Sequence, residues 1–422
     1  MTGLDAREHG VSTGTGDRSK PRAVLLALCA TQITSWGIVY YAFPVLNPQI
    51  TAATGWATGA TTAAFSTALL VSALAGIRVG RIIDHHGPRI VMTAGSALGV
   101  LSVLIVAAAP NLPVFFTGWA LAGLAMASTF YQPAFAVLTR WWAPDHVRAL
   151  TVVTLAGGLA STVFAPVTAL LANHLSWRAT CTVLALILAA VTIPAHAPAL
   201  NAPWSKAPQG RANAVQGASA VVRSRPFWML AAALTLSAFA VYAVVVALVP
   251  LLIERGFATG QAACALGLGG AGQTVGRTLY AAFTRRTGTT VRTAVLIGLG
   301  GVTTAALALV PGPYALVVAL SVAAGMVRGN LTLLQATAIS DRWGTSQYGR
   351  LGSGLLAAPA TTASALAPFA GAALATPLGG YPHLFGLLAL VSGLAAVIAI
   401  GTTPRHLDGE TRGQLPTERA RA

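Results

Sequence analysis

The sequence predicts an all-α membrane protein with twelve transmembrane helices in two pseudo-symmetric six-helix bundles. Three observations support this: the 422-residue chain is 55% apolar and only 9% charged, it contains twelve long apolar segments, and its two halves repeat. Soluble proteins average about 25% charged residues. A mean hydropathy of +0.70 therefore indicates lipid as the surrounding solvent and excludes a soluble enzyme or a disordered chain.

A transmembrane helix needs about 20 mainly apolar residues to cross a hydrocarbon core of about 30 Å. In the first half of the chain, such segments cover residues 23–46, 57–79, 90–109, 114–139, 149–172 and 178–195. In the second half they cover residues 227–253, 260–283, 293–310, 314–340, 351–376 and 384–402. The first segment is longer than the core of a signal peptide, so we expect it to be retained.

A long polar stretch divides these segments into two groups of six. We expect a cytoplasmic tail at 1–22, an N-terminal bundle at 23–195, a cytoplasmic linker at 196–226, a C-terminal bundle at 227–402 and a cytoplasmic tail at 403–422. A shift of 202 residues pairs uncommon residues of the two halves: Tyr40 with Tyr242, Pro48 with Pro250, Arg140 with Arg342, Trp141 with Trp343, Arg148 with Arg350 and Pro166 with Pro368. This indicates a duplicated unit, and parallel six-helix halves with a binding site between them are a transporter architecture.

The basic residues predict the orientation, because Lys and Arg accumulate on cytoplasmic loops. With the N-terminus inside, 22 of the 26 Lys and Arg residues fall on the cytoplasmic side, and only Arg178 and Arg255 lie in outer loops. We expect a multi-pass protein of the plasma membrane, the inner membrane of a bacterial cell, with both termini in the cytoplasm. The net charge of +16 is then mainly an orientation signal and not a nucleic-acid-binding surface.

Other classes of site find no support in the sequence. The three cysteines, Cys29, Cys181 and Cys264, lie in apolar runs, which argues against disulfides and zinc. No Gly-x-x-x-x-Gly-Lys-Ser/Thr phosphate loop and no catalytic cluster of buried His, Cys or carboxylates occurs. We expect no enzyme activity, no cofactor, no metal site and no nucleic-acid partner, and we expect a monomer in the lipid bilayer.

A charged motif follows the second apolar segment and reads Gly80-Arg-Ile-Ile-Asp84-His-His-Gly87-Pro-Arg89. Gly80 would let helices approach closely, Asp84 can pair with a basic group, Gly87 suits a tight turn and Arg89 can hold a partner. The pattern resembles the signature loop of the major facilitator superfamily, which implies that fold and a conformational latch made by these four residues. The alternative is an ordinary solvated turn. The second copy, at 281–288, lacks the acid, so we expect a weaker latch in the C-terminal half.

Two arginines lie deep in apolar segments, where a charge is costly and commonly marks function. At 1.5 Å per residue, Arg328 lies about 21 Å into its helix from Arg342, and Arg277 about 12 Å from Arg285. No Asp, Glu or His occurs at mid-span in the sequence. Because Arg matches a carboxylate or phosphate with a bidentate fork, the sequence predicts an anionic substrate. The alternative is that backbone carbonyls hold both arginines as structural residues.

Gly276-Arg277, with Ala281 four residues later, resembles helix 8 of the monocarboxylate porter and oxalate/formate antiporter families. In those families an Arg at this place binds the substrate carboxylate, which implies the same role for Arg277. Two short stretches are also similar to these families: Ser35-Trp36-Gly37 and Tyr348-Gly349. The chain departs from the monocarboxylate porters at Gln273, where they have an acid, and its helix 1 lacks their lysine. Its helix 11 lacks the lysine of the oxalate carrier, which would be a second charge. Arg328 can replace that second charge.

By the same resemblance, the first, fourth, seventh and tenth helices line a central cavity. Their polar and aromatic candidates are Gln32, Tyr40, Tyr41, Tyr131, Gln132, Tyr242, Asn330 and Gln335. Tyr can donate to a carboxylate while its ring packs, and we expect Tyr40 and Tyr242 to face each other across the cavity. Each candidate is equally compatible with a helix-packing role.

The sequence therefore predicts a secondary active transporter of a small organic anion, a mono- or dicarboxylate, working by alternating access. Since no side-chain proton relay is visible, a proton would enter with the anion, or the carrier would exchange anions. The alternative is an efflux antiporter for lipophilic drugs or metabolites. Such antiporters carry Gly-Pro-x-x-Gly-Gly in helix 5, whereas residues 157–169 have a proline without the following glycines. A membrane sensor or a membrane enzyme is a third alternative.

Overall fold

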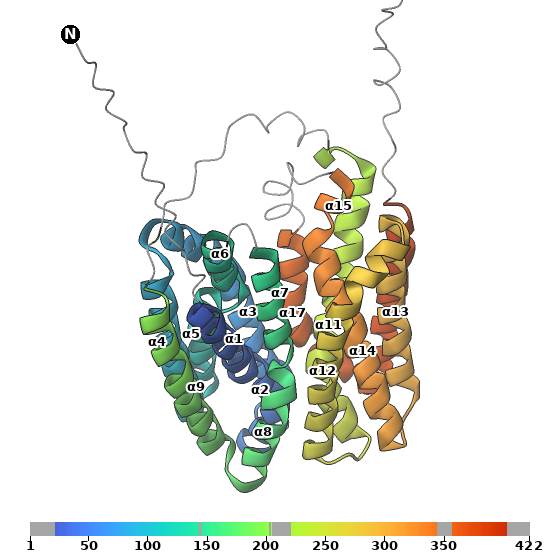
Figure 1. Ribbon diagram of the computed structural model, residues 1–422. Coiled ribbons are helices and arrows are strands. Elements are labelled where there is room, and N and C mark those ends of the chain that lie inside the picture. The colour runs from blue at the N-terminus through green and yellow to red at the C-terminus, as the bar shows by residue number, and fades with distance from the viewer. Residues whose placement is uncertain (1–21, 143–145, 202–203, 205–220, 344–356, 403–422) are drawn as a thin grey trace, which may run out of the picture.

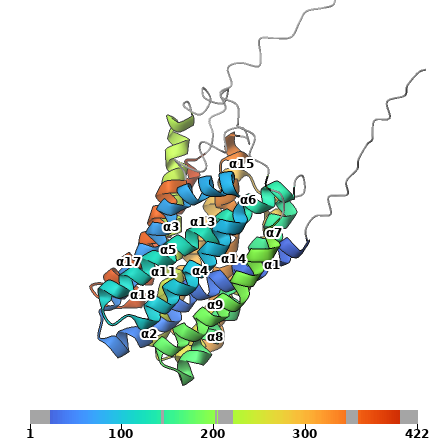
Figure 2. The same ribbon diagram turned by 90° about the vertical axis from the view of Figure 1, so that its left-hand side faces the viewer.

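The computed structural model describes residues 22–142, 146–201, 204, 221–343 and 357–402. Within these ranges the chain forms helices and no strand, and twelve long helical segments make two bundles that stand side by side (Figure 1). Figure 2 shows the N-terminal bundle from its outer side. The predicted all-α class with two six-helix bundles is confirmed. The tails, the central part of the linker, Arg350 and the pair Tyr348-Gly349 lie outside the described residues.

The N-terminal bundle contains six segments, three of which are interrupted. The elements are α1 (Arg22–Ser35), η1 (Trp36–Tyr41), α2 (Ala42–Thr54), α3 (Thr58–His86), α4 (Pro88–Ala108), α5 (Leu112–Thr129), α6 (Tyr131–Trp141), α7 (His146–Gly158), α8 (Ala160–His174) and α9 (Trp177–Ala199). Segment one is α1, η1 and α2 together, segment four is α5 with α6, and segment five is α7 with α8.

The C-terminal bundle is built from more continuous helices. Its elements are α11 (Arg225–Glu254), α12 (Thr259–Arg286), α13 (Thr289–Leu309), α14 (Tyr314–Thr337), the short α15 (Ser340–Trp343), α17 (Ala357–Ala375) and α18 (Tyr381–Ile400). The repeat is visible in the prolines: Pro48 and Pro250 lie inside α2 and α11, while Pro166 and Pro368 lie inside α8 and α17.

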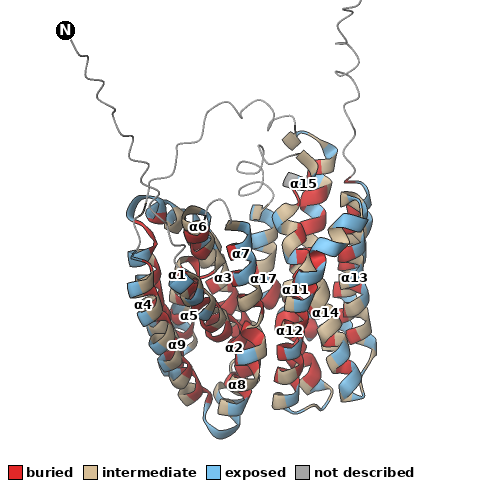
Figure 3. Cartoon of the chain, in the orientation of Figure 1, coloured by how far each residue is buried: buried red, intermediate tan, exposed pale blue. Residues whose placement is uncertain are grey.

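The bundles expose apolar side chains outward, as expected for a protein in lipid. In the described residues, ten helical segments are long and apolar enough to cross a membrane; α12 and α17 complete the twelve. Leu74, Leu309 and Leu390 are more than 70% exposed, and Figure 3 shows exposed residues along the outer helix faces, with buried residues inside each bundle. Soluble monomers rarely expose contiguous apolar surface on this scale, so the chain is a multi-pass membrane protein.

The two ends of the molecule pack differently. We call the end with Arg22, Gly87 and Thr402 the tail end, and the opposite end, with the connections at 55–57 and 255–258, the loop end. Toward the loop end one apolar core contains residues of both bundles. Toward the tail end, the described buried residues form one core in the N-terminal bundle and two in the C-terminal bundle. The halves are therefore joined at the loop end and packed separately at the tail end.

Backbone contact between α12 and α14 is the tightest packing in the C-terminal bundle. A Cβ added to Gly325 would lie 1.9 Å from the Gly269 carbonyl oxygen, and one added to Gly329 would lie 2.1 Å from the Gln273 carbonyl oxygen. A Cβ on Gly276 would lie 2.1 Å from the Met326 carbonyl oxygen. Small residues spaced by four allow this approach, which is the usual device for packing helices in a membrane.

Replacing Gly325 with alanine tests this contact. The added methyl group would collide with backbone of α12, so we expect G325A to lose about 2 kcal/mol of stability or more. The control is G386A in α18, where an added Cβ would meet no atom within 4 Å. Thermal unfolding of both variants in detergent measures the difference. Equal melting temperatures for G325A and G386A would contradict the packing described here.

Candidate functional site

Arg277 is buried where the two bundles meet. It lies on α12, is 6% exposed, and donates from Nη1 to the Thr154 carbonyl of α7. Its Nε is buried without a partner. The Tyr131 hydroxyl lies within interaction distance of the guanidinium. Arg277 therefore links the C-terminal half to the N-terminal half and retains hydrogen-bonding capacity.

Arg328 lies on α14 beside the glycine contact with α12. Its Nε donates to Gln273 Oε1 at 3.1 Å, and its Nη2 is buried without a partner. A neutral amide thus accepts the hydrogen bond, so the charge of Arg328 is not neutralised by α12.

Aromatic residues lie next to the two arginines. The Tyr40 and Tyr242 rings meet edge to face with centroids 6.4 Å apart, and both arginines are close enough to Tyr242 to act on it electrostatically. The expectation that the two tyrosines face each other across a cavity is wrong for this conformation, because the rings are in contact. The Tyr40 hydroxyl is buried and has no hydrogen-bond partner.

Gln32 forms a hydrogen bond to the backbone at a break in the fourth segment. Its Nε2 donates to the Thr129 carbonyl at 2.6 Å, and its side chain is fully buried. That carbonyl lacks its usual helical donor because the residue four positions on is Pro133, which has no N–H. The helix breaks at Phe130 and restarts at Tyr131. Sequence reasoning missed the break, although Pro133 was the signal for it.

Two further irregular stretches converge on the same region. The first segment contains a π-helical turn, η1, closed by the Ala42 N–H bonding to the Gly37 carbonyl. Trp36 of this turn stacks on Phe130 at 4.1 Å and lies 5.2 Å from the Tyr131 ring. Such π-turns are frequent at functional sites, and irregular backbone at membrane depth occurs where protein or a cavity covers it.

The third irregularity is the junction of α7 and α8 at Gly157 and Gly158. The Leu159 N–H bonds to Ala156, three residues back, at 2.9 Å. The Leu155 carbonyl instead accepts from Thr274 Oγ1 at 3.3 Å. An added Cβ on Gly157 would lie 2.3 Å from the Tyr131 hydroxyl, and one on Gly158 would lie 3.2 Å from Arg277 Nη1. The glycine pair thus makes room for both groups.

The remaining cavity candidates contribute less. Asn330 donates to the Met326 carbonyl of its own helix at 2.9 Å. Gln132 is exposed and Gln335 is half-buried. Tyr41 packs against Tyr40 with ring centroids 5.0 Å apart. The structure therefore brings together Arg277, Arg328, Tyr131, Tyr40 and Tyr242, and leaves Gln32 and Asn330 bonded to backbone.

Every described carboxylate is engaged elsewhere. Asp84 pairs with Arg140, Asp341 pairs with Arg292, and Glu254 accepts from the backbone N–H of Tyr381 at 2.9 Å. Among the residues that the structure describes, no acid therefore neutralises Arg277 or Arg328. An uncompensated guanidinium at this depth is costly.

The charged motif of the N-terminal half makes contacts within its own half. Asp84 pairs with Arg140, whose guanidinium lies 4.2 Å from the Trp204 ring centroid. Arg89 donates from Nε to the Ala197 carbonyl and from Nη1 to Asn201 Oδ1, both at 2.7 Å. Together they fix the end of α9 against α3, α4 and α6.

Two expectations about this motif need correction. The motif was expected in a loop, but α3 continues to His86, because the first residue that breaks it is Gly87, at φ +82° before Pro88. Gly80 was expected to permit close helix approach, yet an added Cβ there would meet none of the described atoms within 4 Å. Its small size is therefore not needed for packing in this conformation.

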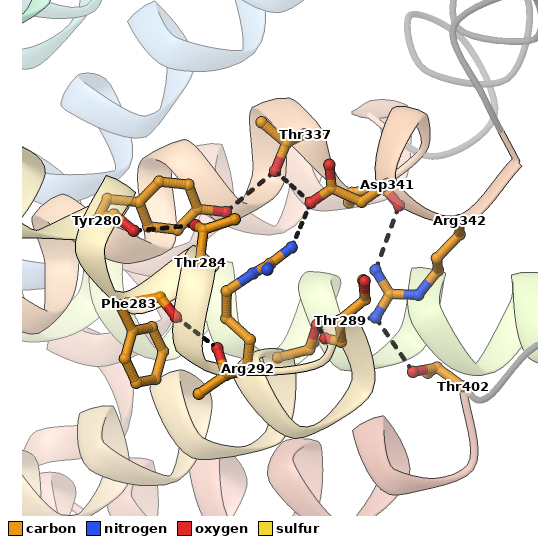
Figure 4. A network of polar contacts seen from close by, with 12 residues as sticks. Tyr280, Phe283, Thr284, Thr289, Arg292, Thr337, Asp341, Arg342 and Thr402 are labelled. Carbon is orange, nitrogen blue, oxygen red and sulfur yellow. Dashed lines mark hydrogen bonds and ion pairs between the residues drawn. The ribbon is translucent and has the colours of Figure 1, made fainter.

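The C-terminal half contains its own buried polar network at the tail end (Figure 4). Arg292 of α13 pairs with Asp341, which also accepts from Thr337 Oγ1 at 3.0 Å. In the N-terminal half the acid lies near the end of the second segment and the base near the end of the fourth, whereas here the base lies near the start of the third and the acid follows the fourth. The motif copy at 281–288 lacks an acid, and Asp341 supplies one to this network from the short helix after the fourth; that the latch is weaker in this half stays a prediction.

Arg342, the repeat partner of Arg140, extends the network shown in Figure 4. Its Nη2 donates to Thr293 Oγ1 at 2.7 Å and to Thr402 Oγ1 at 3.2 Å. Burial lowers the pKa of Arg342 to about 10, so the group stays charged near neutral pH. In each half an arginine thus holds the end of the sixth helix, Arg89 in the N-terminal half and Arg342 in the C-terminal half.

The two loop-end arginines are helix caps. Arg255 donates to the Ala308 and Val310 carbonyls at the end of α13, at 2.6 and 2.8 Å. Arg178 donates to the Ala109 carbonyl after α4 at 2.9 Å. Cations at a helix C-terminus are favourable, which explains why arginine occurs at the loop end.

The cytoplasmic linker was expected to start at residue 196, but α9 includes His196 and continues to Ala199. The imidazole is fully buried. Its Nδ1 lies 2.8 Å from Ser96 Oγ and its Nε2 lies 3.1 Å from Thr31 Oγ1. Both ring nitrogens are therefore occupied by hydroxyls of α4 and α1, and the residue joins three helices.

The two tail-end ion pairs should differ in their contribution to stability. Arg292 is 3% exposed, whereas Asp84 is 51% exposed. D341N leaves a buried cation unpaired and should cost about 3 kcal/mol. D84N removes an exposed pair and should cost under about 1 kcal/mol. Thermal unfolding of the two variants measures this, and an equal or larger effect for D84N would refute the assignment.

The geometry agrees with three comparisons. The profile of the Major Facilitator Superfamily matches residues 28–353. The structure of the nucleoside transporter NupG superimposes with a TM-score of 0.76 at 12% identity, covering 91% of this chain and 99% of that one. A bacterial homologue of the human lysosomal transporter Spinster, inward-facing and unoccupied, gives a TM-score of 0.69 at 14% identity, covering 92% and 95% of the two chains.

A relative in sequence is the uncharacterized 38 kDa protein in the 23S RNA operon of Thermoproteus tenax. It is 29% identical over 154 residues, which are 36% of this chain and 41% of that protein. The alignment thus spans less than half the length of this curated relative. The family profile, by contrast, covers most of the chain, and members of that family are generally not enzymes. The chain belongs to the Major Facilitator Superfamily and is a secondary transporter that takes a small-molecule substrate and sits in a lipid bilayer.

Proposed function

We propose that this transporter moves a small organic anion by alternating access, and that Arg277 and Arg328 bind the anion. The observation that carries the proposal is that Arg277 Nε and Arg328 Nη2 are buried without a partner. A buried nitrogen without a partner is not distinctive by itself, since Arg292 Nε also has no hydrogen-bond partner. The charge of Arg292, however, is neutralised by its ion pair with Asp341. Arg277 and Arg328 have no carboxylate in the part of the chain that the structure describes.

An anion is the ligand that satisfies this arrangement best. A guanidinium has five donors, and the Thr154 carbonyl and the Gln273 amide are neutral acceptors that leave both positive charges in place. The alternative, that backbone carbonyls hold the arginines as structural residues, applies in part to Arg277, which donates to the Thr154 carbonyl. It does not account for Arg328, whose partner is a side-chain amide. A carboxylate between the two would supply charge and acceptors together.

The packing of the halves supports alternating access. In alternating access the two halves are closed against each other at one end and separated at the other. The shared core at the loop end and the separate cores at the tail end fit one such state. We further propose that both termini lie in the cytoplasm, since arginines gather at the tail end, in the adjoining ends of α3 and α4 (Arg81, Arg89) and of α12 and α13 (Arg285, Arg286, Arg292). The conformation is then inward-facing, and the protein resides in the plasma membrane.

The proposed coupling follows from the titratable groups. Among the described residues no Asp or Glu lies near the two arginines, and His196 is enclosed by hydroxyls away from them. A proton would therefore enter together with the anion, or a second anion would travel in return. The 12% identity to the nucleoside transporter shows the fold alone, and an uncharged nucleoside would leave both guanidinium charges uncompensated.

Transport by arginine variants tests the proposal. In proteoliposomes we expect counterflow of a labelled carboxylate to fall about 10-fold or more in R277Q and in R328Q, because hydrogen bonds between charged groups contribute about 1.5–3 kcal/mol. R285Q, an exposed residue of the same helix, is the matched control and should keep wild-type counterflow. Protein-free liposomes give the passive leak.

Two results would reject the anion site. One is wild-type counterflow in the R277Q/R328Q double variant. The other is a wild-type protein that moves no carboxylate but does move uncharged lipophiles, which would favour the efflux alternative.

A further inference from the structure

A small apolar cavity lies inside the C-terminal bundle, next to Arg328. It has a volume of about 40 Å³ and lies between α11, α12, α13 and α14. Its apolar walls include Val241, Val245, Leu248, Leu266, Leu307 and Leu331. Arg328 is the one charged residue among the lining residues. The cavity thus connects a cationic group to a hydrocarbon-like interior.

Apart from Arg328, the polar side chains in the lining are hydroxyls, and their hydrogens are already donated. Thr303 Oγ1 donates to the Leu299 and Gly300 carbonyls, Thr304 Oγ1 to the Gly300 carbonyl and Ser321 Oγ to the Val317 carbonyl, at 2.8–3.1 Å. Each hydroxyl hydrogen is therefore used within its own helix. A second carboxylate or another acceptor placed here would lose its hydration without a hydrogen bond in return, which is unfavourable.

We infer that this cavity binds the hydrocarbon tail of the substrate while Arg328 binds its anionic head, so the substrate carries one anionic group and a short apolar chain. The inference rests on the proposed function and deepens it. A water-sized position occupies about 10–15 Å³ of such a cavity, so 40 Å³ corresponds to a chain of about three carbons. Dicarboxylates and hydroxylated anions of equal length are disfavoured.

The chain-length series formate, acetate, propionate, butyrate and hexanoate tests the tail, with succinate as the dicarboxylate. Dissociation constants are measured by titration calorimetry on the purified full-length protein. We expect affinity to rise about fourfold per added methylene up to butyrate, to level off at hexanoate, and to be at least 10-fold lower for succinate than for butyrate.

Filling the cavity tests its location. An added Cβ on Gly300 would lie 3.7 Å from Leu331 Cδ1 and 3.8 Å from Val327 Cγ1, both lining residues. G300V should raise the dissociation constant for butyrate about 10-fold and change that for formate by less than about twofold. The matched control is G298V on the same helix, whose Cβ would lie 3.7 Å from the Ala396 Cβ of α18. Its dissociation constants should follow the same dependence on chain length as those of the wild type. V244A enlarges the cavity and should therefore increase the affinity for hexanoate relative to butyrate. This variant tests the location of the tail site if G300V does not fold.

The outcomes separate this inference from the function on which it rests. If carboxylates bind and R328Q abolishes binding, but affinity is independent of chain length or succinate equals butyrate, the tail site is wrong and the anion site stands. The same conclusion follows if G300V weakens formate and butyrate equally. If no carboxylate binds to the wild-type protein, both proposals fail.

Discussion

The site depends on one constraint, the backbone contact between α12 and α14. Because Gly269 faces Gly325 and Gln273 faces Gly329 with no side chain between them, the main chains of the two helices lie against each other. This crossing brings Gln273 of α12 within hydrogen-bonding distance of Arg328 of α14. One turn further along α12, Arg277 reaches the other half of the molecule. A larger residue at Gly325 or Gly329 would separate the two arginines.

The second half of the site is assembled from irregular backbone. The π-turn at Trp36, the break at Phe130 and the glycine junction at 157–158 all adjoin Tyr131, and the glycine junction also adjoins Arg277 of α12. Each break frees a carbonyl or opens a space that a side chain from another helix then uses, as Gln32 does at Thr129 and Thr274 does at Leu155. Arg277 belongs both to the contact between the halves and to the proposed anion site.

The sequence predicted what depends on hydropathy and duplication. The twelve segments, the two bundles and the depth of Arg277 and Arg328 follow from apolar length and from the distance to helix ends. The hydrogen-bond partners did not follow, because they depend on tertiary contacts: Gln273 could be recognised as an acceptor for Arg328 only once α12 and α14 were packed. Asp341 as the partner of Arg292 was missed for the same reason, since 49 residues separate them. The free carbonyl of Thr129 was readable in advance from Pro133, and the α12 contact from its glycines.

The central claim is that an organic anion binds at Arg277 and Arg328. A thermal-shift titration of the purified protein tests it most directly, using a panel of organic anions on wild type, R277Q, R328Q and R285Q. We predict that at least one carboxylate raises the melting temperature of wild type and R285Q in a saturable manner and leaves R277Q and R328Q unchanged. An equal shift in all four proteins, or stabilisation of none by any anion, would contradict the account.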